Sequence, residues 1–254
     1  MSERLRIGVV GAAGRLGSRV VRLADAKPDL ELVAVLTGSD SEAPRTGVRV
    51  ASGPSELARA AQVVVDFSAP PACASVAPAC AEAATAYVLA STGLDDAARD
   101  AVAAAAQHIP VLQAANCSFG VNALLQLVRE AAQRLRDFDV EIVELHHGHK
   151  RDAPSGTAKA LGAAVQQERS ELEAVEGRHG LCGPRGADEL GYAAVRGGDV
   201  AGEHTVYFFG HGERLELTHR ATTPDIFADG SLKAARWLHG CPPGLYSMQD
   251  VLRA

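Results

Sequence analysis

The chain of 254 residues is long enough to bury one large hydrophobic core or two smaller ones. Its formal charge of −6 argues against a nucleic-acid or anionic-membrane partner, whose phosphates require a basic surface, so we expect neither. The 5 cysteines lack the CxxC spacing of a zinc ribbon or a small disulfide scaffold, which predicts reduced thiols in a cytoplasmic protein.

The first predicted element is a strand over Leu5–Val10, followed by a glycine turn and an amphipathic helix to about Ala26. Gly11, Gly14 and Gly17 have the spacing GxxGxxG. In a dinucleotide-binding fold such a turn lets the backbone approach a pyrophosphate, although glycines also serve tight turns and close helix packing. Its place between the first strand and the first helix favours cofactor binding.

Apolar residues near the start of the chain do not form a targeting segment. Arg15 interrupts the first apolar run, so we expect no signal peptide. We also expect no membrane span, because no stretch approaches the roughly 20 apolar residues that one needs.

The second strand is predicted over Leu30–Leu36 and ends at Thr37-Gly38-Ser39. A carboxylate at this place normally binds the adenosine ribose of NAD. Its absence, with Arg15 and Arg45 as candidate cations for a ribose phosphate, predicts that NADPH is accepted as well as NADH. Asp40 is the alternative ribose ligand, so the preference stays open.

Further strands alternate with helices up to residue 117, which predicts a parallel sheet with right-handed crossovers. The strands are Val63–Phe67, Tyr87–Ala90 and Val111–Gln113, and the helices are Ala72–Ala84 and Asp95–Gln107. Their ends carry small or polar residues such as Ser91, Thr92 and Asn116. Each is explained equally well by a cap or turn, but together they predict a ligand-binding edge at the carboxyl ends of the strands.

After Ser118 the pattern changes to strands that follow strands, which predicts a second domain with a mainly antiparallel sheet. Its expected elements are a helix over Gly120–Arg136, a strand over Val140–Leu145, a helix over Thr157–Leu172, a loop over Glu173–Asp188, and strands over Tyr192–Arg196, His204–Phe209 and Arg214–His219. A helix over Asp229–Leu238 and a last strand or tail over Leu245–Val251 return to the first domain. The fold class is therefore α/β. A Rossmann-like domain of residues 1–117 and 225–254 is joined to an α+β domain of residues 118–224, expected to bind substrate and form oligomers.

The segment Glu141–Lys159 concentrates titratable and anion-binding groups where a predicted strand ends. Hydride donation to an unsaturated, anionic acceptor needs a proton source and groups that bind its carboxylates. His146 is a proton donor suited to neutral pH, and Lys150 is a second donor or cation. Ser155-Gly156-Thr157 opens a helix with hydroxyls and free backbone N–H groups that suit a carboxylate.

Other interpretations of this segment stay open. Histidines at 146, 147 and 149 have the residue type of metal ligands, but the neighbouring Lys150 disfavours a cation, so we expect no metal. His149 is as easily structural as functional. Asp152 caps the turn and orients Lys150.

With these residues assembled, the sequence resembles the dihydrodipicolinate reductase (4-hydroxy-tetrahydrodipicolinate reductase) family of the bacterial diaminopimelate and lysine pathway. The resemblance is most specific at ELHHGHKRDAPSGTA and is supported by GAAGRLG, NCSFGVN, GEHTV, THRAT and FADGSLKAARWL. It implies a Rossmann-like domain interrupted by a substrate domain whose sheet mediates a homotetramer. It also implies NAD(P)H-dependent reduction of a small cyclic dicarboxylate to tetrahydrodipicolinate.

Site roles follow from the resemblance residue by residue. His146 would protonate the reduced ring with help from Lys150, while His147, Ser155 and the Gly156-Thr157 turn would hold carboxylates. The cofactor would contact Gly11, Ala12, Ala13, Gly14, Arg15, Leu16, Thr37, Gly38, Phe67, Ala90, Ser91, Thr92, Ala114, Ala115, Asn116 and Cys117. Ala90, Cys117 and Pro224 depart from the residues frequent in the family.

Two alternatives remain at this stage. One is another Rossmann-fold oxidoreductase acting on an imine or an amino acid. The other is a catalytically idle dinucleotide-binding sensor, which would leave the His-Lys-SGT constellation without a role.

Overall fold

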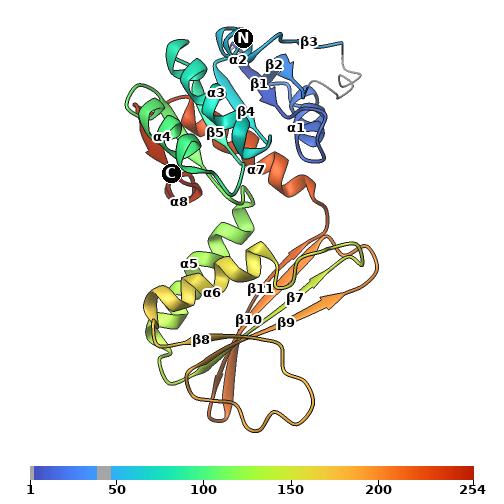
Figure 1. Ribbon diagram of the computed structural model, residues 1–254, viewed down its shortest axis with the longest axis vertical. Coiled ribbons are helices and arrows are strands. Elements are labelled where there is room, and N and C mark those ends of the chain that lie inside the picture. The colour runs from blue at the N-terminus through green and yellow to red at the C-terminus, as the bar shows by residue number, and fades with distance from the viewer. Residues whose placement is uncertain (1–2, 39–46) are drawn as a thin grey trace. The chain divides into compact units, whose positions relative to one another are not determined.

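The computed structural model describes residues 3–38 and 47–254 (Figure 1). The chain divides into two compact units, one of Met1–Phe119 with Asp225–Ala254 and the other of Gly120–Pro224. The second boundary coincides with the expected one, and the first lies two residues beyond it. Ser39, Asp40 and Arg45, the residues considered for the cofactor ribose, lie outside the described part of the chain.

The first unit contains a seven-stranded sheet in the order β12-β6-β5-β4-β1-β2-β3. Every recorded pairing in it is parallel, which confirms the prediction. The strands are β1 (Leu5–Val10), β2 (Leu30–Leu36), β3 (Arg49–Val50), β4 (Val63–Asp66), β5 (Ala86–Leu89), β6 (Pro110–Gln113) and β12 (Gly244–Tyr246). Strand β3 was not predicted, and β12 forms part of the segment that was expected to be a last strand or tail.

Helices cover both faces of this sheet. They are α1 (Gly17–Asp25), α2 (Pro54–Ala60), α3 (Pro70–Glu82), α4 (Asp96–Ala105), α7 (Asp225–Leu238) and α8 (Met248–Arg253). Val63 and Val65 pack into the core with α1, α7 and α8, whereas Val64 packs into the core with α2, α3 and α4. Because both faces are buried, the strands are continuous apolar runs, and for that reason they were readily predicted.

The second unit contains a five-stranded sheet in the order β11-β10-β7-β9-β8. Its elements are α5 (Phe119–Arg134), β7 (Asp139–His146), α6 (Gly156–Glu168), β8 (Glu173–Glu176), β9 (Glu189–Arg196), β10 (Gly202–Gly210) and β11 (Glu213–Ala221). The sheet is mixed. Strand β10 runs antiparallel to β7 and β11, while β9 runs parallel to β7 and β8. The parallel pair arises because α6 crosses between β7 and the strands that follow, so the chain returns in the same direction.

Strand β8 corrects the expectation of a loop over Glu173–Asp188. Its four residues, EAVE, place charged side chains at both ends and bury none of them. Such a short, charged segment is typical of an edge strand and lacks the apolar alternation by which a strand is predicted. The remainder of the segment, after Gly177, connects β8 to β9.

Helices α5 and α6 lie on one face of the second sheet (Figure 1). Val140 and Ile142 of β7 point to that face and are buried there. Helix α6 approaches the sheet most closely at Gly162, where an added Cβ would lie 1.7 Å from the Tyr192 hydroxyl oxygen. A larger residue at this position would require the Tyr192 side chain or the helix to move, so glycine permits the close approach of α6 to the strands.

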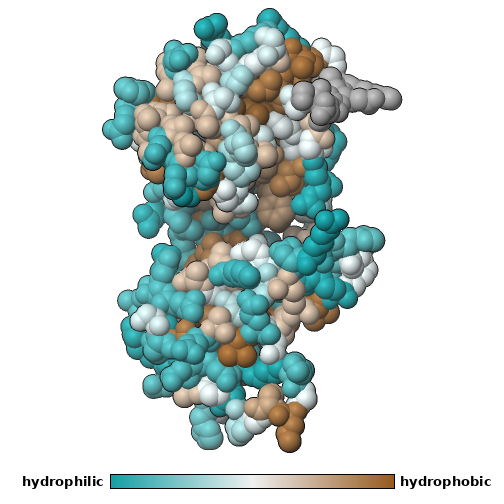
Figure 2. All heavy atoms as spheres, viewed as in Figure 1, coloured by the Kyte–Doolittle hydropathy of each residue, from teal (hydrophilic) through white to brown (hydrophobic). Residues whose placement is uncertain are grey.

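On the visible face, hydrophilic side chains cover much of the unit with the five-stranded sheet, whereas apolar side chains gather in broader areas on the other unit (Figure 2). Among the described residues, no helix has both the length and the apolar character that crossing a membrane requires.

Candidate active site

The predicted cofactor residues lie along one edge of the first sheet. At the end of each strand, the next backbone N–H donates to a carbonyl of the neighbouring strand, which aligns the loops side by side. The bonds run from Gly11 to Leu36 (2.9 Å), from Phe67 to Val10 (3.2 Å), from Ala90 to Asp66 (2.9 Å) and from Ala114 to Leu89 (2.9 Å). The edge is therefore built from the segments that carry the predicted contacts.

The glycine turn lies where the strand order reverses, since β1 lies between β2 and β4. Ligands of doubly wound sheets bind at this switch point. Gly11 has a φ of +73°, and an added Cβ would lie 2.9 Å from the Phe67 carbonyl oxygen. An added Cβ at Gly17 would lie 2.0 Å from the Gly11 carbonyl oxygen. Glycine is required at both positions for the turn to fold back against the start of α1.

The turn presents backbone N–H groups suited to a phosphate. Those of Ala13, Arg15 and Leu16 have no hydrogen-bond acceptor within the described part of the chain. Ala13, Gly14 and Arg15 are exposed, so these groups and the Arg15 guanidinium are accessible. A helix start with free N–H groups and a nearby cation fits the pyrophosphate of a dinucleotide.

Polar side chains in the other loops of this edge mainly shape the backbone. The Ser91 hydroxyl donates to the Ser68 carbonyl at 2.6 Å, and the Asn116 side-chain oxygen accepts from the Ser118 N–H at 2.9 Å. Cys117 is buried, and burial raises the pKa of its thiol to about 12, so it stays neutral. The Asn116 bond lies within a turn, as the cap-or-turn interpretation expects, whereas the Ser91 bond joins two loops. Contact of either residue with the cofactor stays a prediction.

The buried carboxylate of Asp66 stabilises one loop of this edge by hydrogen bonds. Asp66 is fully buried and accepts hydrogen bonds from the Tyr87 hydroxyl at 2.6 Å and the Ser68 N–H at 2.7 Å. Both donors are neutral. The interactions fix the loop that carries Phe67.

In the second unit, the predicted acid and the predicted carboxylate-binding turn are joined by Glu144 of β7. Its side chain is 1% exposed. One oxygen, Oε2, accepts from Nδ1 of His146 at 2.5 Å and from Nη1 of Arg196 at 2.8 Å. The other, Oε1, accepts from the Ser155 N–H at 3.1 Å and from Nη2 of Arg196 at 2.6 Å.

His146 is oriented by this carboxylate. A carboxylate facing Nδ1 favours the proton on that nitrogen. The other nitrogen, Nε2, has no hydrogen-bond partner among the residues that the structure describes. Burial lowers the pKa of His146, and Glu144 opposes this shift by its hydrogen bond and its charge. A histidine held in this way is suited to proton transfer through Nε2.

Ser155 forms the N-terminal cap of α6 and is itself buried. Its hydroxyl accepts from the Ala158 N–H at 3.2 Å and lies 3.0 Å from Nε2 of His204. Both the N–H and the hydroxyl of Ser155 are thus engaged within the protein. Gly156 is exposed and Thr157 is partly exposed, so they present the turn to solvent.

His204 lies behind the predicted acid on β10. It is 4% exposed, its ring is 5.1 Å from that of His146 between centroids, and its Nδ1 has no partner in the described residues. Burial, assisted by the charge of His146, lowers the pKa of His204 to about 4, so it is neutral at pH 7. The neutral His204 ring therefore places no second positive charge beside His146.

The loop after β7 carries the remaining predicted residues. Lys150 pairs with Asp152 at 2.8 Å, in agreement with the interpretation that Asp152 orients this lysine. Arg196 also donates to the Asp152 carbonyl at 2.7 Å, which ties the loop to the network. His147 accepts from the N–H of His149 through Nδ1 at 3.2 Å, so both histidines belong to the loop and not to the buried cluster.

The chemistry of the buried cluster is that of a hydrogen-bonded acid. Donor atoms of Glu144, His146 and His204 lie within 4.8 Å of one another, a grouping that metal sites also show. Arg196, however, binds both oxygens of the carboxylate and adds a positive charge. A cation at this place would have to displace the guanidinium.

Sequence reasoning missed Glu144, Arg196 and His204 as members of the site. Strand register brings them together: His146 is opposite Arg196 of β9, and Glu144 is opposite His204 of β10. A signal for Glu144 was present, because it alternates with Val140 and Ile142 on the covered face. A carboxylate in phase with buried valine and isoleucine is expected to be buried as well.

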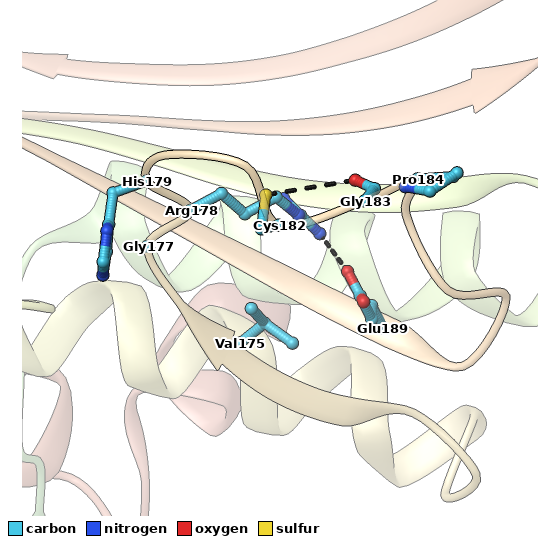
Figure 3. A pocket seen from close by; sticks show the side chains of 8 residues that line it. All are labelled: Val175, Gly177, Arg178, His179, Cys182, Gly183, Pro184 and Glu189. Atoms are coloured by element: carbon cyan, nitrogen blue, oxygen red, sulfur yellow. Dashed lines mark hydrogen bonds and ion pairs between the residues drawn. The ribbon is translucent and has the colours of Figure 1, made fainter.

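A separate pocket in this unit lies between β8 and the segment leading to β9 (Figure 3). It has a volume of about 290 Å³ and is lined by Val175, Gly177, Arg178, His179, Cys182, Gly183, Pro184 and Glu189. Arg178 in its wall is paired with Glu189 and Glu141, so its charge is compensated. No predicted site residue lines this pocket.

Comparison with known proteins agrees with this arrangement. Residues 5–117 match the family description "Dihydrodipicolinate reductase, N-terminus", and residues 120–252 match "Dihydrodipicolinate reductase, C-terminus". The chain is 48% identical over 261 residues to the 4-hydroxy-tetrahydrodipicolinate reductase of Anaeromyxobacter sp. (strain Fw109-5), covering 98% of this chain and 97% of the relative. It is 43% identical over 265 residues to the enzyme of that name from Syntrophotalea carbinolica, covering 98% of each.

Among solved structures, the fold is similar to dipicolinate-bound dihydrodipicolinate reductase from Paenisporosarcina sp. TG-14. The TM-score is 0.82 at 24% sequence identity, and the alignment covers 96% of this chain and 97% of that one.

Proposed function

The chain belongs to the dihydrodipicolinate reductase family, and we propose that it uses NADH or NADPH to reduce the dihydropyridine dicarboxylate formed from 4-hydroxy-tetrahydrodipicolinate, giving tetrahydrodipicolinate. The reaction is a step of diaminopimelate and lysine biosynthesis. The observation that carries the proposal is the Glu144 carboxylate, which holds His146 and the turn at Ser155 together. A proton donor beside an anion-binding helix start matches the needs of this substrate.

The protein residues divide the work of the reaction. The bound nicotinamide supplies the hydride. His146 delivers a proton from Nε2 and is reprotonated from solvent after each turnover. Lys150, oriented by Asp152, places positive charge beside the reacting ring.

Substrate carboxylates are held at the start of α6. The backbone of Gly156 and Thr157 lies at the positive end of the helix dipole, which favours a carboxylate, and His147 adds a ligand from the loop. Ser155 supports the turn from below, because its own polar groups are bound to Glu144, Ala158 and His204. This refines the predicted role of Ser155 from substrate ligand to cap of the turn.

The proposed function is tested by following cofactor oxidation by absorbance after addition of substrate made in place by the synthase that precedes this step. We expect oxidation of NADH, NADPH or both, and the ratio of the two kcat/KM values gives the preference. No oxidation of either cofactor contradicts the proposal. An acceptor with a single carboxylate is the control and should react poorly.

We also propose that the chain is a cytoplasmic homotetramer assembled through the second sheet. The support is its face opposite α5 and α6, where Val195 and Phe209 are 50% and 37% exposed and Tyr207 stacks on Phe209 at 5.5 Å. Apolar strand surface of this kind is suited to burial against another copy. Light scattering after size exclusion tests the assembly, and a monomer mass contradicts it.

A further inference from the structure

Glu144 connects three separate parts of the second unit through one carboxylate. Its partners are His146 on the same strand, Arg196 on β9 and the N–H of Ser155 at the start of α6. The proton donor and the substrate turn are therefore attached to opposite oxygens of the same group. Their relative position is set by a single side chain that is nearly without solvent exposure.

All four groups that contact Glu144 are hydrogen-bond donors. An ionised carboxylate accepts from all of them, since it offers two oxygens and carries no proton. A glutamine at this position would offer one oxygen and would direct two N–H groups at further donors. Charge, and not shape alone, is therefore required at residue 144.

We propose that Glu144 is a positioning residue for the reduction: it keeps the proton of His146 on Nδ1 between turnovers, helps the ring to hold its second proton on Nε2, and fixes that ring against the Ser155 turn. The proposal rests on the proposed function for the identity of the reaction. Arg196 has the opposite effect on His146: its positive charge partly neutralises Glu144 and disfavours the protonated ring.

Charges around His146 predict opposite effects for the two partners. Glu144 favours the protonated ring, while Lys150 and Arg196 disfavour it, and His204 is a neutral neighbour. Loss of the Glu144 charge should lower the pKa of His146, and loss of the Arg196 charge should raise it. A purely structural role gives no reason for opposite signs.

The test compares Glu144→Gln with Arg196→Met over about pH 4.5–9, a range that includes the limb after a shift to lower pH. A proton donor must be protonated, so activity falls as pH rises through its pKa. We expect this falling limb to move by about one pH unit to lower pH in Glu144→Gln and to higher pH in Arg196→Met. We expect kcat to fall at least about tenfold in Glu144→Gln, with the KM for the cofactor changed less than about twofold.

Glu141→Gln is the matched control. Glu141 lies on the same strand, points to the opposite face and is likewise held by guanidinium groups, those of Arg178 at 2.9 Å and Arg185 at 3.1 Å. The falling limb of this variant should not move. If both test variants lose activity with the limb unmoved, or shift it in the same direction, the proposal is overturned.

Histidine NMR provides a readout that does not depend on turnover. In the resting protein, the ring nitrogen shifts of His146 should report a proton on Nδ1, and their titration should move in opposite directions in the two variants. Arg196→Met keeps this test available if Glu144→Gln does not fold, because the Arg196 side chain is 20% exposed and tolerates replacement more readily. Absence of reductase activity with these titrations intact would contradict the proposed function alone.

Discussion

Each unit buries a carboxylate near the carboxyl end of a strand, and the two are held in different ways. Asp66 in the first unit accepts from a tyrosine hydroxyl and a backbone N–H, both neutral. Glu144 in the second unit accepts from an arginine, a histidine and a backbone N–H. The difference separates a carboxylate that shapes a loop from one that controls the proton of a neighbour.

The two sites around these carboxylates differ accordingly. The edge supported by Asp66 presents backbone N–H groups and small residues, which suit a phosphate and need no proton transfer. The cluster around Glu144 contains two histidines and a guanidinium, whose charge states respond to one another. Substitutions in the second unit should therefore affect turnover and pH dependence, and those in the first should affect loop geometry.

The largest expected effect is on turnover in His146→Gln. Removing the proton donor should lower kcat by about 10²- to 10⁴-fold while the dissociation constant of the cofactor changes less than about twofold. Steady-state kinetics and cofactor fluorescence titration measure the two quantities. His149→Gln, in the exposed part of the loop, is the control and should retain most activity. Equal losses of turnover and cofactor binding would indicate a structural histidine.

Next in size is the stability lost in Glu144→Ala. The substitution leaves Arg196 and His146 without their buried partner, so the free energy of unfolding should fall by about 3–5 kcal/mol. Urea denaturation at pH 7 measures it. Glu141→Ala, on the other face of β7, should cost about 1 kcal/mol or less because its partners remain partly solvated. Similar losses of unfolding free energy in both variants would show that the buried Glu144 contributes no more to stability than the more exposed Glu141.

A smaller effect is expected in the pH dependence contributed by His204. Its pKa is lowered from 6.5 to about 4 by burial, so between these values the unfolded chain binds the proton more readily. The neutral ring therefore contributes stability that is present above pH 6.5 and is lost as pH falls towards 4. Between pH 7 and pH 5 the free energy of unfolding should fall by about 2 kcal/mol more in the wild type than in His204→Gln. If the urea midpoint of unfolding falls by the same amount in both proteins between pH 7 and pH 5, the prediction is wrong.

The smallest expected effect is that of Asp66→Asn. An asparagine can accept from the Ser68 N–H with its oxygen and donate to the Tyr87 hydroxyl, which then acts as acceptor. The cost should be about 1 kcal/mol in urea denaturation, with turnover almost unchanged. A loss as large as that of Glu144→Ala would show that the charge of Asp66 matters as well, and the contrast between the carboxylates would fail.

Much of the first unit could be predicted from apolar runs. The bounds of β1 and β2 agree with the predicted strands residue for residue, because strands buried on both faces are continuous apolar segments between glycine and turn residues. Helix α2 and strand β3 were not predicted. Strand β3 has two exposed residues and offers no pattern.

In the second unit, the sequence predicted site residues within the segment Glu141–Lys159 and did not predict their hydrogen-bond partners on other strands. His146, Lys150 and the Ser155 turn were predicted because they are close together in the chain. Arg196 and His204 are brought to them only by the register of β9 and β10, which no local pattern specifies. The parallel pairing of β7 with β9 was not predicted for a similar reason. The direction of β9 depends on the crossover through α6, which the residues of β9 do not reveal.

The contact of α6 with the sheet at Gly162 has a mechanical consequence for catalysis. Residue 162 lies about 9 Å along the helix from Gly156, and a methyl group there would meet the Tyr192 oxygen in its present position. A side chain too large for the Tyr192 ring to make way would push the helix from the sheet and move its first turn relative to His146. The spacing between His146 and the start of α6, the two parts of the proposed substrate site, thus depends on a residue with no side chain and no chemical role of its own. A larger side chain at residue 162 is therefore expected to lower turnover without contacting the substrate.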